Sequence, residues 1–201
     1  LNAHLFNELE KLKPLYFNET NPLNKQNYKA KIDDLIIRLS NGYREFDFEV
    51  YYSEVFHKKN GFDIIIANPP YITVALGKKQ KFFTEEMVRI FKEKYKNVFE
   101  YKGNTFSLFF AKSISLLRKQ GVLTFITPNT LLLNSTFSKT REFLLKYCNI
   151  KLLLNITDRV FEEAEIGGNL ITIVSKNSID NNIVQFKEIA DLNEFTSNLT
   201  Y

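Results

Sequence analysis

The sequence predicts an α/β fold in which a sheet of largely parallel strands carries crossover helices, preceded by two N-terminal helices. From residue 62 onward, short apolar runs alternate with longer stretches at helical spacing. That alternation is typical of parallel sheets joined by helices. The chain has 201 residues, of which 44% are hydrophobic and 25% charged, so it is large enough and apolar enough to form a globular core.

The first 45 residues form a helical segment in this interpretation. Apolar residues recur at helical spacing in residues 1–13 and 25–41, which predicts two helices. Asn24 is a candidate cap for the second helix and Gly42 a candidate stop. We therefore expect an N-terminal helical segment, residues 1–45, followed by a second domain, residues 46–201.

The second domain contains the alternating elements. Five strands are expected at residues 62–67, 122–127, 150–156, 170–175 and 183–189. Three helices are expected at residues 84–98, 104–118 and from about 135 to 147. The first strand, FDIIIA, is a continuous apolar run, the form expected of a strand that is covered on both faces.

Composition excludes several classes of protein and of site. Cys148 is the only cysteine and the chain has two histidines, so neither an internal disulfide nor a nitrogen- and sulfur-ligated metal site is expected. No apolar run approaches the roughly 20 residues of a membrane span. The N-terminus lacks the apolar core of a signal peptide. We expect a cytoplasmic protein that does not enter a membrane.

The positive charge is concentrated in one segment. Residues 78–102 carry eight basic and four acidic residues, which accounts for the whole net charge of +4. A solvated helix face is one explanation of such a run. Contact with a phosphate backbone is the other, and Lys78, Lys79 and Lys81 are then the candidate DNA-binding residues.

The tetrapeptide Asn68-Pro69-Pro70-Tyr71 ends the first strand of the second domain. Successive prolines lack backbone donors, so they cannot continue a strand and their carbonyls stay free to accept hydrogen bonds. Asn68 adds a side-chain acceptor, and Tyr71 adds a flat aromatic face. Such a rigid group of acceptors beside an aromatic ring suits a planar ring that bears an exocyclic amine. A stiff loop that only ends a strand is the structural alternative.

The tetrapeptide and its context resemble a known family. YSEVFHKKNGFDIIIANPPYI, NTFSLFFAKSISLLRKQGVLTFITPNTLL and TREFLLKYCNIKLLLNITDRVFEEAEIGGNLITIVSK are similar to segments of the adenine-specific DNA methyltransferases of restriction-modification systems. The resemblance covers about residues 46–176. It implies a Rossmann-like sheet, S-adenosylmethionine as cofactor and double-stranded DNA as substrate.

The resemblance also implies roles for individual residues. In the family an adenine is swung out of the duplex, and its amine donates hydrogen bonds to the positions of Asn68 and Pro69, within a catalytic motif that includes Pro70. Tyr71 and Phe161 would stack on the extruded base. Phe109 occupies the position of an aromatic residue that contacts the adenine of the cofactor.

One family motif is missing. The family holds its cofactor on a Gly-rich loop upstream of the catalytic motif, and none of the seven glycines forms a G-x-G loop before residue 68. The expectation is therefore a fragment without the cofactor-binding half and without a target-recognition region. We expect that this chain alone binds the cofactor poorly and is inactive, and that its exposed sheet edge can pair with a second copy.

Other functions remain open at this point. The same tetrapeptide occurs in methyltransferases of protein glutamine and of RNA bases, because an amide and an aromatic amine present similar NH₂ groups. The long Lys-rich segment, residues 78–102, favours adenine in DNA as the target over these two alternatives. A non-catalytic DNA-recognition module, which keeps the loop without the reaction, is an alternative of a different class.

Overall fold

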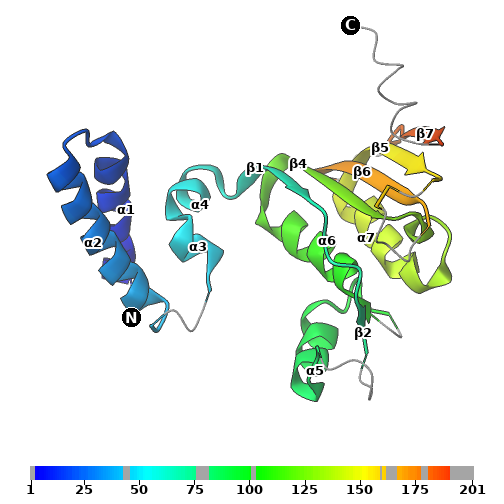
Figure 1. Cartoon of the computed structure of the whole chain (residues 1–201), viewed down its shortest axis with the longest axis horizontal. Coiled ribbons are helices and arrows are strands. Elements are labelled where there is room, and N and C mark those ends of the chain that lie inside the picture. Colours follow the sequence, from blue (N-terminus) through cyan, green and yellow to red (C-terminus); the bar gives the residue numbers. More distant parts are fainter. Residues whose placement is uncertain are drawn as a thin grey trace, which may run out of the picture. The chain divides into compact units, whose positions relative to one another are not determined.

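The computed structural model describes residues 3–42, 46–75, 82–100, 103–158, 160–161, 167–177 and 181–190 (Figure 1). The chain divides into two compact units, Leu1–Phe62 and Asp63–Tyr201. A domain boundary at residue 45 stays a prediction. Among the described helices, none is long and apolar enough to cross a lipid bilayer.

The first unit is helical, which confirms the two expected N-terminal helices. They are α1 (Ala3–Asn18) and α2 (Pro22–Leu39), followed by the short α3 (Phe48–Tyr51) and α4 (Ser53–Lys59). The cap of α2 is Asn21, whose side chain accepts hydrogen bonds from the N–H groups of Leu23 and Asn24. The expectation of Asn24 as cap is wrong because Pro22 starts the helix earlier, with φ already fixed at a helical value.

A buried ion pair joins the helices of the first unit. Lys13 of α1 is 5% exposed and its Nζ lies 2.6 Å from a carboxylate oxygen of Glu54 in α4. The same Nζ donates to the carbonyls of Val50 and Tyr51. These bonds place the ammonium group among the acceptors that a buried charge requires.

The second unit contains a sheet of five strands in the order β1-β4-β6-β5-β7. Their bounds are β1 (Phe62–Ala67), β4 (Leu117–Pro128), β5 (Cys148–Ile156), β6 (Asn169–Lys176) and β7 (Gln185–Ile189). The crossover helices are α6 (Thr105–Leu116) before β4 and α7 (Ser138–Tyr147) before β5. The expected α/β sheet with crossover helices is confirmed.

The direction of β6 differs from the expected parallel arrangement. This strand is antiparallel to both of its neighbours, β4 and β5, while β5 and β7 are parallel. No helix intervenes among the described residues between β5 and β6, so the chain can return directly beside β5 in the opposite direction. Three strands, β4, β5 and β7, therefore point the same way.

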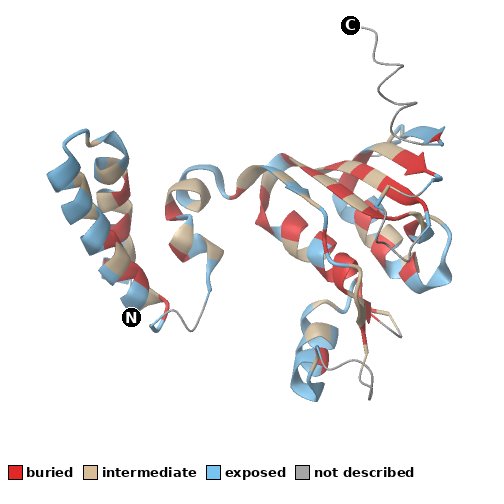
Figure 2. Cartoon of the chain, viewed as in Figure 1, coloured by how far each residue is buried: buried red, intermediate tan, exposed pale blue. Residues whose placement is uncertain are grey.

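Helices α6 and α7 lie on the same face of the sheet, where the buried residues gather (Figure 2). The Thr140 hydroxyl of α7 donates to Ser107 of α6 at 2.9 Å in a buried contact. On β1, by contrast, Ile64 is 62% and Ile66 is 75% exposed. The expectation that this strand is covered on both faces is wrong for the described chain, because β1 is an edge strand and carries no helix over these two side chains.

A smaller sheet follows the candidate loop. β2 (Thr73–Val74) pairs antiparallel with β3 (Gly103–Asn104), and α5 (Glu85–Lys94) lies between them in the sequence. Val74 is buried with Val88, Val98, Phe99 and Leu108. A side chain at Gly103 would come within 2.5 Å of the Phe99 ring, so this close approach requires glycine. This apolar cluster attaches the Lys-rich segment to β2, the strand that follows the candidate loop.

Candidate active-site loop after β1

Asn68, Pro69, Pro70 and Tyr71 form the loop that leaves β1 at its carboxyl end. The Tyr71 hydroxyl lies 2.6 Å from Asn68 Oδ1 and 3.0 Å from the carbonyl oxygen of Ile126 in β4. A single hydroxyl proton can serve only one of these acceptors at a time or be shared between them. Tyr71 therefore connects the side-chain acceptor of the loop to the central part of the sheet.

The Tyr71 hydroxyl is protonated at neutral pH, as in an ordinary tyrosine, and its environment favours that state further. Burial raises the pKa of this phenol above its usual range, because a charged phenolate is poorly solvated there. The ring meets Phe106 edge to face, with ring centroids 6.4 Å apart. At neutral pH the hydroxyl is thus a donor, and it orients the Asn68 amide so that Oδ1 faces the tyrosine. The second lone pair of that oxygen remains available to a further donor.

Thr105 contacts the loop, although the sequence patterns described above do not single it out. It is the first residue of α6, and its hydroxyl donates to the Pro70 carbonyl and accepts from the Ile72 N–H. The only sequence signal is a β-branched hydroxyl residue directly after Asn104, which caps the helix. Such residues are common at helix starts for capping alone, so this signal does not identify the contact.

Phe161 follows the carboxyl end of β5, on the side of the sheet where β4 also ends. Pro128 of β4 and Ile156 of β5 both pair with Asn169 of β6, so the two strands end at the same level on either side of β6. Phe161 follows β5 and is 37% exposed. The described hydrogen bonds and ring contacts do not join it to Tyr71, and its role in base stacking stays a prediction.

Phe109 is exposed on a helix that is otherwise mostly buried. The residue is 44% exposed, whereas Phe106 and Phe110 in the same helix are at most 1% exposed. A core position is the commoner place for phenylalanine. This exposure leaves an aromatic face free for a flat ligand, and the predicted contact with a cofactor is untested.

Lys78, Lys79 and Lys81 lie outside the described residues. Of the Lys-rich segment, the structure describes α5 and the residues on either side of it. Thr84 caps this helix by accepting from the Met87 N–H, and Val88 attaches it to the cluster beneath Val74. The described part of the Lys-rich segment is therefore packed against β2, which follows the loop.

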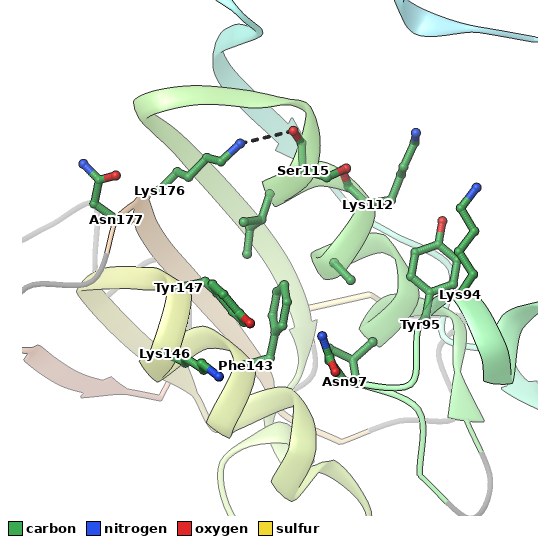
Figure 3. Close-up of a pocket in the computed structure, with 13 residues that line it drawn as sticks. Lys94, Tyr95, Asn97, Lys112, Ser115, Phe143, Lys146, Tyr147, Lys176 and Asn177 are labelled. Carbon is green, nitrogen blue, oxygen red and sulfur yellow. Dashed lines mark hydrogen bonds between the residues drawn. The ribbon is translucent and has the colours of Figure 1, made fainter.

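A cavity of about 610 Å³ lies at the other end of α6 (Figure 3). Four lysines line it, together with apolar and tyrosine side chains: Lys94, Lys112, Lys146 and Lys176. Lys176 Nζ donates to the carbonyls of Ser115 and Leu117, where α6 ends. Lysines at helix C-termini offset the partial negative charge of free carbonyls. Lys94 and Lys146 lie in the last turns of α5 and α7, so helix ends explain three of the four lysines.

The cavity is separate from the loop. Thr105 contacts the loop and Ser115 lines the cavity, and ten helical residues at about 1.5 Å each separate them by roughly 15 Å. We therefore assign the candidate site to the loop after β1 and its surroundings.

Comparison with known proteins identifies the family of this chain. Residues 4–161 match the family described as Eco57I restriction-modification methylase. The Type II methyltransferase M.TthHB8I of Thermus thermophilus is 36% identical over 83 residues, which are 41% of this chain and 19% of that protein. The Type II methyltransferase M.AccI of Acinetobacter calcoaceticus is 30% identical over 144 residues, 69% of this chain and 25% of that protein.

A solved structure shares the fold. The Type ISP restriction-modification enzyme LlaGI, in a nuclease-deletion mutant bound to a DNA substrate mimic, superposes with a TM-score of 0.54 at 18% identity. The match covers 71% of this chain and 13% of that one. The chain therefore spans a quarter or less of each of these proteins.

Proposed function

Because this chain belongs to the Eco57I restriction-modification methylase family, we propose that it carries the catalytic loop of a DNA methyltransferase. The proposed reaction transfers a methyl group from S-adenosylmethionine to the exocyclic amine of an adenine. The observation that carries the proposal is the loop itself, in which Asn68, Pro69, Pro70 and Tyr71 leave a strand end with their acceptors fixed.

The residues of the loop suit an amine that must become a nucleophile. Asn68 Oδ1 and the Pro69 carbonyl would accept the two N–H bonds of the target amine, which localises the nitrogen lone pair outside the ring. Holding that lone pair in line with the methyl group lowers the entropic part of the barrier. The Tyr71 ring would stack on the extruded base and offset part of the cost of unstacking, about a few kcal/mol. Phe161 would close the other face.

The cofactor fits this chain in part. S-adenosylmethionine, when bound, would supply an electrophilic methyl group on a sulfonium. Among the described residues, Phe109 presents an exposed aromatic ring that would suit its adenine ring. The sequence has no G-x-G loop for its methionine part. We therefore propose that other residues of a longer protein complete the cofactor site, and that this chain alone does not turn over.

Duplex DNA is the proposed substrate, and the Lys-rich segment is its proposed contact. Lys78, Lys79 and Lys81 lie between Tyr71 and α5 in the sequence, so phosphate contacts there would fall close to the base-binding loop along the chain. Replacing all three by glutamine should weaken binding of unrelated duplexes equally. It should also reduce the slope of log K against log salt by about 0.9 for each phosphate that the variant no longer neutralises. A DNA substrate also favours a cytoplasmic location.

The exposed strand β1 supports the proposal that further polypeptide covers this sheet. Ile64 and Ile66 present an apolar surface on an edge strand, and such an edge favours pairing with another strand. We propose that an upstream cofactor-binding half of the same protein takes this place, with a target-recognition region elsewhere. A second copy of this chain could occupy the edge in the absence of that half.

Labelled S-adenosylmethionine tests the function. The full-length protein that contains these residues is incubated with unmethylated DNA and cytosolic protein, beside an Asn68→Ala variant. Label on DNA adenine that disappears in Asn68→Ala is expected. Asn134→Ala is the control, since Asn134 caps the short 3₁₀ helix that begins at Ser135 and lies outside the loop. Label on protein would assign the chain to the glutamine methyltransferases, and no label would favour a recognition module.

A further inference from the structure

Thr105 makes three hydrogen bonds to the chain that follows the two prolines. Its hydroxyl donates to the Pro70 carbonyl and accepts from the Ile72 N–H at 3.0 Å. Its own N–H donates to the Ile72 carbonyl at 2.9 Å. The residue is 8% exposed, so water competes little for these bonds. One residue at the start of α6 thus binds both polar groups of Ile72 and the carbonyl before Tyr71.

These bonds replace the support that a strand would give. Pro69 and Pro70 have no N–H group, so no sheet ladder can hold this part of the main chain. The Tyr71 hydroxyl ties the loop to Ile126 in β4, and Thr105 ties it to α6. Because the proline ring fixes φ of Pro70, clamping the Pro70 carbonyl leaves one soft dihedral, ψ of Pro70, between Thr105 and the Pro69 carbonyl.

We propose that Thr105 is a positioning residue for methyl transfer, acting through Pro70 and Ile72 to set the direction of the Pro69 carbonyl and of Asn68. The proposal rests on the function proposed above. Thr105 does not touch the base or the cofactor in this scheme. Its hydroxyl keeps the two acceptors at the spacing that an NH₂ group requires, and a small displacement of such groups costs up to about 100-fold in rate.

Two variants of Thr105 separate this role from simple stabilisation. Thr105→Val keeps the shape and removes the hydroxyl, whereas Thr105→Ser keeps the hydroxyl and removes the methyl group. In the full-length protein we expect Thr105→Val to lower kcat roughly 10- to 100-fold, with the KM values for DNA and for S-adenosylmethionine nearly unchanged. Thr105→Ser should retain kcat within a few-fold.

Thr140→Val is the matched control. It also removes a buried threonine hydroxyl, the one that donates to Ser107 between α6 and α7, but it does not contact the loop. Its kcat should equal that of the wild type, although its thermal stability falls. A kcat of Thr105→Val within twofold of the wild type would overturn the proposal. A parallel loss of kcat in Thr140→Val would do the same, since a general effect on packing would then explain both.

Amide hydrogen exchange tests the clamp without requiring activity. In the 201-residue chain, NMR should show faster exchange of the Ile72 amide in Thr105→Val and wild-type protection in Thr105→Ser. Unchanged exchange in Thr105→Val would refute the clamp itself. If the wild-type full-length protein methylates no DNA, the proposed function fails, and so does the proposed role of Thr105 in methyl transfer. Faster exchange of the Ile72 amide in Thr105→Val would then show only that Thr105 holds the loop in place.

Discussion

Tyr71→Phe removes one oxygen atom from the candidate site and leaves the aromatic ring. That oxygen lies 2.6 Å from Asn68 Oδ1 and 3.0 Å from the Ile126 carbonyl. A neutral hydrogen bond contributes about 1 kcal/mol net to stability, so the free energy of unfolding should fall by about that amount. The edge-to-face contact with Phe106 remains, which limits the loss.

The effect on transfer should be larger than the effect on binding. Without the hydroxyl, the Asn68 amide can rotate and present its NH₂ group where an acceptor is needed. We expect kcat in the full-length protein to fall roughly tenfold, which corresponds to about 1.4 kcal/mol of activation free energy. The KM for DNA should change little because the stacking ring is intact. Tyr71→Ala, which also removes the ring, should raise that KM.

The pH dependence gives the same contact a second test. The raised pKa of Tyr71 means that its contribution to stability is complete below about pH 10 and is lost as the pH rises through the raised pKa. Tyr71→Phe should lack this alkaline loss. Equilibrium urea unfolding and single-turnover methylation measure the two quantities. A variant with wild-type stability and a kcat within twofold of the wild type would refute the reasoning, because the hydroxyl would then hold neither Ile126 nor Asn68.

Three further changes test other parts of the chain. Lys13→Met should lower the free energy of unfolding by about 2–4 kcal/mol in urea titrations, since it leaves the part-buried Glu54 carboxylate without its partner; a loss below about 0.5 kcal/mol would contradict this. Burial raises the pKa of the Cys148 thiol to about 12, so alkylation at pH 8 should be far slower in the native protein than in urea. By linkage, the contribution of this thiol to stability should be constant below about pH 9 and then fall by about 1.4 kcal/mol per pH unit up to that pKa; Cys148→Ala should lack this part of the alkaline loss. Ile66→Lys should reduce concentration-dependent self-association in sedimentation, because it charges the exposed edge strand; unchanged association would place the contact elsewhere.

Local chemistry explains why much of the candidate site could be predicted. Two prolines after Ile64–Ala67 must end a strand whatever surrounds them, so Asn68 and Tyr71 could be placed at a strand end from the sequence. The alternation of apolar runs and helical spacing likewise predicted α6 and α7 and the sheet that they cover. These features depend on residues that are neighbours along the chain.

Contacts between residues that are distant along the chain could be identified only from the tertiary structure. Thr105 lies 33 positions from Ile72, and Ile126 lies 55 positions from Tyr71, and nothing in the sequence pairs them. The reversed direction of β6 and the exposure of Ile64 and Ile66 also depend on which elements pack together. The sequence alone determined the loop and its acceptors, because proline and asparagine act locally. Only the tertiary structure decided what holds that loop in place, because hydrogen bonds between separate elements depend on how the chain packs.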